Sequence, residues 1–112
     1  MRMLLATGAL GAPTYSEVNM PMVVVKITAT PGPSVTLVGI MIDGKNVPLV
    51  NNEVTVSLAS PDRYILMWHF TGNSGETLGI KVEAGGKIVL EVKKSRIPAD
   101  ESAGAGIDRF DI

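Results

Sequence analysis

Apolar and polar side chains alternate along most of the chain from Met22 onward, in short runs separated by Gly, Pro, Asn and Asp. β-Branched residues pack well on a pleated surface, and the four separating residue types are typical of chain reversals. Helical spacing is almost absent from this stretch. The pattern predicts strands at residues 22–30, 34–42, 45–50, 53–59, 63–70, 76–84, 87–93 and 108–112.

Three dipeptides predict the tight turns between these strands. Asp43-Gly44 is the strongest hairpin signal, because a two-residue turn of this kind needs positive φ at both positions. Gly85-Gly86 predicts a second two-residue hairpin, and Asn51-Asn52 predicts another turn. The proline in 45–50 marks that strand as irregular or as an edge strand. Residues 97–106 are rich in Pro, Ala and Gly, and we expect a loop there.

The strand count and the tight turns predict an all-β fold, an antiparallel sandwich of about seven to eight strands in a single domain over residues 22–112. Residues 1–21 are interpreted as an N-terminal arm or an edge strand. The alternative is a weak export signal, because Arg2 precedes an apolar stretch from Met3 to Leu10 that small residues follow. The predicted core consists of Val25, Ile27, Val38, Ile40, Val56, Leu58, Leu66, Trp68, Ile80, Val82, Leu90 and Val92.

Composition narrows the range of partners. The formal net charge is −1 and the sequence pI is about 5.7, so nucleic acid is not predicted as a partner, since phosphate binding needs a concentrated positive surface. The chain has no cysteine, which excludes disulfides, thiolate metal sites and thiol catalysis. The N-terminal apolar stretch is too short to span a membrane. These properties leave the compartment open, whether exported, cell-surface or cytoplasmic.

The residues that carry chemistry are few. His69 is the only histidine, and strand alternation puts it on the opposite face from Trp68 and Phe70. Four carboxylates near the end of the chain offer oxygen ligands for calcium, but their spacing favours a solvated loop; they are Asp100, Glu101, Asp108 and Asp111. The sequence predicts no catalytic residue, no metal site and no cofactor.

One local pattern resembles a known family. Leu58, Pro61 and Tyr64 stand where one predicted strand ends and the next begins, and this resembles the corner tyrosine of immunoglobulin-like and fibronectin type III-like sandwiches. The resemblance implies that the Tyr64 hydroxyl bonds to the chain upstream, in an immunoglobulin-like or jelly-roll-like arrangement. The chain departs from the immunoglobulin pattern in two respects: it lacks the cysteine pair, and Trp68 lies on the strand of Tyr64 rather than on an earlier one.

Two predicted strands break the alternation that a half-exposed strand should show. In 34–42 and in 63–70, apolar residues occupy both faces. If these strands are neighbours in one sheet, their outer faces form an apolar patch of a kind that monomers rarely expose unless it serves binding. We expect this contact surface to comprise Val35, Leu37, Met41, Ile65 and Met67, with His69 at its edge.

The occupant of that surface has two interpretations. The chain's own N-terminal segment, with Met1, Met3, Leu4 and Leu5, can cover it, or it can bind another protein or a second copy of the chain. The sequence thus favours a non-catalytic binding or structural module that acts through protein contact, including self-association. The alternative is a carbohydrate or small-ligand module that uses the loops around Asn51-Asn52, 72–75 and 98–108.

Overall fold

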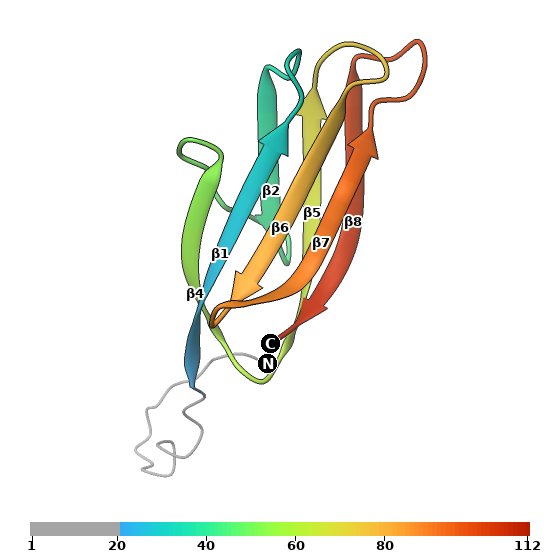
Figure 1. Ribbon diagram of the computed structural model, residues 1–112. Helices are drawn as coiled ribbons and strands as arrows, with labels where there is room; N and C mark the ends of the chain where they lie inside the picture. The colour runs from blue at the N-terminus through green and yellow to red at the C-terminus, as the bar shows by residue number, and fades with distance from the viewer. Residues whose placement is uncertain (1–20) are drawn as a thin grey trace.

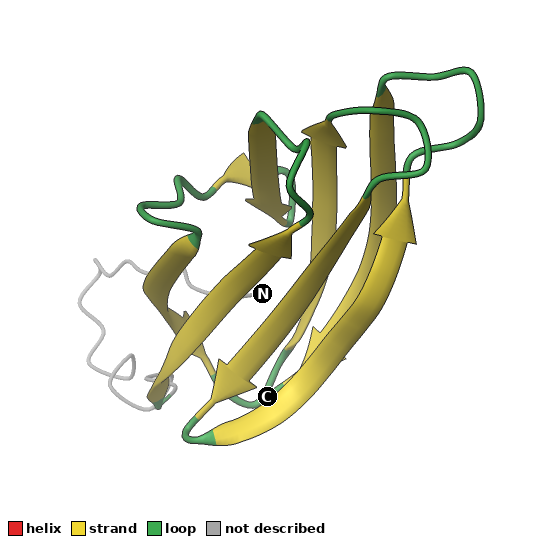
Figure 2. Ribbon diagram, turned by 45° about the horizontal axis from the view of Figure 1, so that its top comes forward, coloured by secondary structure: helices red, strands yellow, loops and turns green. Residues whose placement is uncertain are grey.

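The computed structural model describes residues 21–112 and places them in eight strands that form two antiparallel four-stranded sheets (Figure 1). The strands are β1 (Met22–Pro31), β2 (Leu37–Ile42), β3 (Lys45–Asn46), β4 (Glu53–Ala59), β5 (Arg63–Thr71), β6 (Thr77–Ala84), β7 (Lys87–Arg96) and β8 (Ala103–Asp111). One sheet has the order β4-β1-β6-β7 and is called the β1 sheet; the other has the order β3-β2-β5-β8 and is called the β5 sheet. The predicted all-β sandwich is confirmed, and Figure 2 shows its two layers.

The core lies between the sheets and is built from alternate residues of the central strands. Most of the predicted core is buried, and five predicted members are only partly buried and pack at its margin: Val38, Val56, Leu58, Leu90 and Val92. Four of them lie on the edge strands β4 and β7, and Val38 lies near the start of β2, where the opposite sheet covers less of each side chain. The buried residues are Val25, Ile27, Ala29, Ile40, Ile42, Val47, Tyr64, Leu66, Trp68, Phe70, Leu78, Ile80, Val82, Ala84, Ile97 and Phe110.

The tight turns have the predicted backbone geometry. The φ angles are 51° and 82° in Asp43-Gly44, and 59° and 86° in Gly85-Gly86, so both positions of each hairpin are left-handed. Asn51-Asn52, with φ of 55° and 64°, also reverses the chain, and Val50 and Glu53 hydrogen-bond to each other across it.

Several predicted boundaries differ from the structure, and strand 87–93 extends to Arg96 as β7. Strand 34–42 begins only at Leu37, because the preceding residues form a turn in which the Val35 N–H donates to the Gly32 carbonyl at 3.1 Å. Strand 45–50 shortens to β3, since the proline that follows cannot donate to a ladder. The predicted loop 97–106 was wrong over its second half, because β8 begins at Ala103.

The early start of β8 follows from its packing. Gly104 and Gly106 pair with Phe70 and Trp68 of β5 and occupy inward positions. A Cβ atom on Gly106 would overlap the indole ring of Trp68, and one on Gly104 would press on the ring of Phe70. Glycine is the residue that leaves room for both rings, so a segment with low strand propensity becomes a strand through tertiary contact.

Polar groups of two core aromatics fix the sheets and the corner. The Trp68 indole N–H donates to the Ser95 hydroxyl of β7 at 2.9 Å and so links the two sheets. The Tyr64 hydroxyl donates to the Ala59 carbonyl at 2.8 Å, five residues upstream. The Tyr64 ring stacks on Phe110 with 5.6 Å between centroids. Buried Tyr and Trp side chains bury a large apolar area, and each also has one polar group that needs a hydrogen-bond partner.

Candidate functional site: an apolar sheet face

The two strands with apolar residues on both faces are neighbours in the β5 sheet. Met41 of β2 pairs with Met67 of β5, and Leu37 pairs with Thr71. Because their even-numbered neighbours point into the core, Leu37, Met41, Ile65 and Met67 lie on the outer face. Leu37 is 55% exposed and Ile65 is 42% exposed. The structure therefore brings these four predicted contact residues together.

Val35 does not lie with them. It precedes β2 in the Gly32–Val35 turn, and its side chain is half-buried and packs against the core. The alternation on which the prediction rested does not extend across a turn, because the backbone there is not extended. The contact face therefore starts at Leu37.

Strand β8 supplies a third row to this face that the sequence did not predict. Ala103, Ala105 and Ile107 pair with Thr71, His69 and Met67 and share their side of the sheet. Ile107 is 63% exposed. The signal was present as a period-two pattern of Ala, Ala and Ile with glycines between them, but the glycines suggested a loop.

His69 lies in the middle of the face rather than at its edge. Its neighbours in register are Gly39 on β2 and Ala105 on β8. A Cβ atom on Gly39 would overlap the His69 imidazole, so the ring lies over the glycine. Small residues on both sides therefore leave the centre of the face flat, with one polar ring in it.

Polar pairs mark both ends of the apolar face. At one end, the Thr36 and Thr71 hydroxyls are 2.9 Å apart and share a hydrogen bond. At the other end, the Arg63 Nε donates to the Asp111 carboxylate at 2.7 Å. That hydrogen bond lowers the pKa of Asp111 and raises the pKa of Arg63. The face is thus an apolar centre with a polar margin, the arrangement that is typical of protein interfaces.

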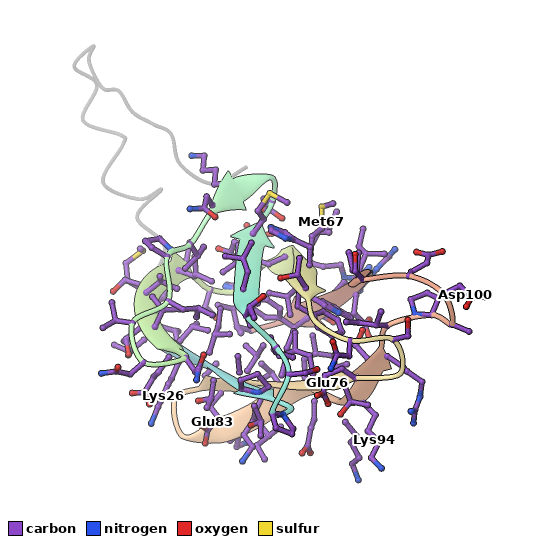
Figure 3. All side chains as sticks on the ribbon, turned by 90° about the horizontal axis from the view of Figure 1, so that it is seen from above. Lys26, Met67, Glu76, Glu83, Lys94 and Asp100 are labelled. Atoms are coloured by element: carbon purple, nitrogen blue, oxygen red, sulfur yellow. The ribbon has the colours of Figure 1, made fainter. Side chains whose placement is uncertain are left out.

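The outer face of the β1 sheet has the opposite character along most of its length. Figure 3 shows Met67 on one side of the molecule and Lys26, Glu83 and Lys94 on the other. Lys26 and Glu53 form an exposed ion pair at 3.7 Å on this polar side. The two sheets have the same number of strands but present different chemistry to solvent.

The β1 sheet exposes apolar side chains only at one end, among the residues that the structure describes. Met22, Val24 and Ile88 are exposed where β1 begins and where the β6–β7 hairpin turns. These residues come from two strands, β1 and β7, whereas the apolar face of the β5 sheet spans three. It does not change the contrast between the sheets.

Two of the three loops proposed for a small ligand lie together. The 72–75 loop and the 97–102 loop are joined by three hydrogen bonds, from Gly72 N–H to Ser102 O at 3.0 Å, from Gly75 N–H to Ile97 O at 2.9 Å and from the Ser74 hydroxyl to Glu101 O at 2.6 Å. The Asn51-Asn52 turn lies apart from them beside β1, where Ala29 N–H donates to Asn52 O. The three hydrogen bonds between the joined loops, all accepted by backbone carbonyls, hold these two loops against each other.

Glu76 holds the neighbouring loop in place. Its carboxylate accepts hydrogen bonds from the Ser34 hydroxyl at 2.6 Å, from the Ser34 N–H at 2.8 Å and from the Thr77 N–H at 3.1 Å. These bonds lower the pKa of Glu76, with the Ser34 hydroxyl as the largest cause. A Cβ atom on Gly32 would overlap this carboxylate. The carboxylate therefore ties the turn before β2 to the start of β6, which is a structural role.

The structure offers little support for a metal site, a sugar-binding platform or a small-molecule pocket among the described residues. Within residues 21–112, no group of three or more His, Cys, Asp or Glu side chains is placed to hold a metal ion. Four aromatic residues that a sugar platform would need on the surface are buried: Tyr64, Trp68, Phe70 and Phe110. A shallow hollow of about 400 Å³ on the β1 sheet, between Thr30, Lys81 and Lys93, is open to solvent.

Three predictions concern residues 1–20, which lie outside the described residues: the arm, the export signal, and a cover formed by Met1, Met3, Leu4 and Leu5. The described part of the chain contains no helix with the length and apolar character needed to cross a membrane. Comparison with protein families, with curated proteins and with solved structures finds no match.

Proposed function

We propose that this protein is a non-catalytic binding or structural module that acts through protein–protein contact. Its contact surface is the outer face of β2, β5 and β8. The observation that carries the proposal is the three-strand apolar face centred on Met67 and His69, opposite a charged sheet. Exposed side chains on all three strands form one patch rather than isolated apolar positions.

The size of the face bears on the kind of contact. Three strands at about 4.8 Å spacing and seven residues at about 3.4 Å give a footprint of about 14 Å by about 24 Å, or about 340 Å². A stable interface buries about 800 Å² on each partner. The apolar face is therefore the centre of a larger interface that includes its polar margin, or the whole of a weak one.

We also propose that the sandwich is immunoglobulin-like or fibronectin type III-like in kind. Support comes from the Tyr64–Ala59 hydrogen bond at the corner before β5 and from the position of β5 between β2 and β8, as strand F lies between C and G in that family. The β6–β7 hairpin is a departure, since it intervenes between β5 and β8 and extends the opposite sheet.

Site-directed photocrosslinking tests the contact surface. A benzophenone amino acid at Leu37 reports contact on the apolar face, and the same group at Thr55, exposed on the polar face, is the control. In cells that express the protein, we expect heavier adducts at Leu37 and none at Thr55. Equal adducts at both positions, or none at either, would contradict the proposal.

Solution mass then separates self-association from contact with another protein. We expect Leu37→Asp with Met67→Asp to leave the fold intact and to abolish the adducts that a benzophenone amino acid at Met41, on the same face, forms in the original chain. The control is Thr55→Asp with Ser57→Asp on the polar face. If the purified chain forms a dimer that only the first pair of substitutions removes, the partner on the face is a second copy. A chain that is monomeric while the adducts persist has a different protein as partner.

A further inference from the structure

Strand β8 is a long edge with little protection against pairing. It ends the β5 sheet and hydrogen-bonds only β5 among the strands that the structure describes. Natural edge strands are usually short, bulged or charged. β3 has only two residues, and β7 carries several lysines and two register shifts. Residues 103–107 of β8 have no charge, no proline and no bulge against β5.

The register shows which backbone groups of β8 point away from the sheet. Asp62 and Ile112 exchange two hydrogen bonds, of 3.1 and 3.0 Å. Because hydrogen-bonded pairs alternate in an antiparallel ladder, Gly104 and Gly106 also bond to β5. The N–H and C=O groups of the intervening residues therefore point outward.

One of these outward groups is already occupied. The Arg109 N–H donates to the carboxylate of its neighbour Asp108 at 2.8 Å. The outward N–H and C=O groups that a new strand can use are therefore those of Ala103, Ala105 and Ile107. These are the same residues whose side chains lie on the apolar face.

We propose that β8 pairs antiparallel with β8 of a second copy of this chain, about a two-fold axis at Ala105. In this register each Ala105 faces the other, and Ile107 faces Ala103 of the second copy. Arg109 then lies beyond Ala103 of the second copy, on the side of its Glu101, which stands in the loop two residues before β8. Opposite charges therefore approach each other at both ends of the ladder. The interface is isologous, as a two-fold dimer requires.

Charge selects this register over its neighbours. A two-fold axis at Gly106 would bring the loop residue Glu101 toward Asp111, and an axis at Gly104 would bring the loop residue Asp100 toward Asp108. Like charges that are directly opposite destabilise a strand pair. An axis at Ile107 avoids repulsion but forms no opposite-charge pair. Only the axis at Ala105 combines small apolar pairs at the centre with opposite charges at the ends.

The paired edges would join the two β5 sheets into one sheet of eight strands. The apolar faces of both copies would then lie side by side on the same surface. This pairing is a contact separate from the one proposed for the face, because it uses the backbone of the edge. It therefore stands or falls independently of which partner covers Leu37 and Met67.

Hydrogen exchange on the intact chain tests the pairing without any substitution. We expect the amides of Ala103, Ala105 and Ile107 to become at least about fivefold slower to exchange as protein concentration rises and the dimer forms. Gly104 and Gly106, which already bond to β5, are internal controls whose exchange should change much less. If all five amides exchange at rates that are independent of concentration up to the millimolar range, the proposal is wrong.

Charge reversal tests the register by sedimentation equilibrium at low salt. Arg109→Glu alone, or Glu101→Arg alone, is expected to raise the dimer Kd by about fivefold or more, because symmetry alters both end pairs at once. The double variant restores opposite charges and is expected to return the Kd to within about twofold of the original. Single variants that match the original, or a double variant that is no better than the singles, overturn this register.

The face variant distinguishes the two proposals. Leu37→Asp with Met67→Asp leaves the β8 edge unchanged, so the edge dimer is expected to persist in it. Loss of the dimer in that variant would place self-association on the face and would overturn the edge pairing. Melting curves of every variant show whether each one is folded at the temperature of the measurement.

Discussion

Gly106→Ala tests the packing that turns residues 103–106 into a strand. Gly106 sits on the inner side of β8 against the indole of Trp68, and the added methyl group would overlap that ring. Trp68 is buried and its N–H is tied to Ser95 on the opposite sheet, so the ring cannot move aside freely. The methyl group can be accommodated only if the two sheets or β8 shift.

The magnitude follows from two opposing effects. Overpacking of a well-packed core costs about 1–3 kcal/mol. Replacement of a strand glycine recovers about 0.4–1 kcal/mol, because the unfolded chain loses freedom. The two ranges give a net loss in the free energy of unfolding between about 0 and about 2.6 kcal/mol. The severe overlap with the indole places the expected loss at about 1–2 kcal/mol. For a domain near 100 residues, each kcal/mol lowers Tm by about 4–8 °C.

Urea denaturation followed by tryptophan fluorescence and by far-UV circular dichroism measures this loss. Trp68 is the only tryptophan in the chain, so the signal comes from the site itself. Gly39→Ala is the matched control: its methyl group also overlaps a ring, but that ring belongs to the exposed His69, which can rotate into solvent. We expect the control to change stability by less than about 0.5 kcal/mol. Equal stability of Gly106→Ala and the original chain would refute the packing argument.

Two further predictions concern single polar contacts. Tyr64→Phe keeps the ring that stacks on Phe110 and removes the hydroxyl that bonds to Ala59, so unfolding in urea should show a loss of about 1 kcal/mol; an unchanged midpoint would mean that the hydroxyl adds nothing to stability. Glu76→Gln tests how stability depends on pH. The pKa of Glu76 is lower in the folded protein than in the unfolded chain, so the ionised carboxylate stabilises the fold. That stabilisation is complete above the unfolded pKa of about 4.3 and is lost as pH falls through the folded pKa. Thermal melts from pH 7 to pH 2 should fall less steeply in the variant below about pH 5, and parallel curves would contradict this role.

The sequence predicted those features that depend on local chemistry. Asp43-Gly44 and Gly85-Gly86 form the turns that their positive φ angles require. In β5 the even-numbered residues, which include all of its aromatic side chains except His69, are buried as strand alternation predicted. The contact surface was predicted on the condition that the two strands with apolar residues on both faces are neighbours, and β2 does pair with β5.

The sequence could not predict features that depend on contacts between distant strands. In the sequence alone, Gly104 and Gly106 indicate a loop. Their place in a strand depends on contacts with the rings of Phe70 and Trp68, which belong to a distant strand. The third row of the apolar face was missed for the same reason, since Ile107 joins it only through pairing with Met67. His69 seemed peripheral because its neighbours Gly39 and Ala105 are not adjacent to it in sequence.

The connection between β5 and β8 has a consequence for how the molecule is assembled. Tyr64 and Phe110 pair across a stretch of chain that includes the whole β6–β7 hairpin, whereas only two residues separate the paired residues Ala84 and Lys87. Closure of a long loop costs more entropy than closure of a short one, so local hairpins are expected to precede the docking of β8. The third row and the open edge both belong to β8. A chain in which β8 has not yet docked therefore lacks both of the features on which the proposed contacts depend.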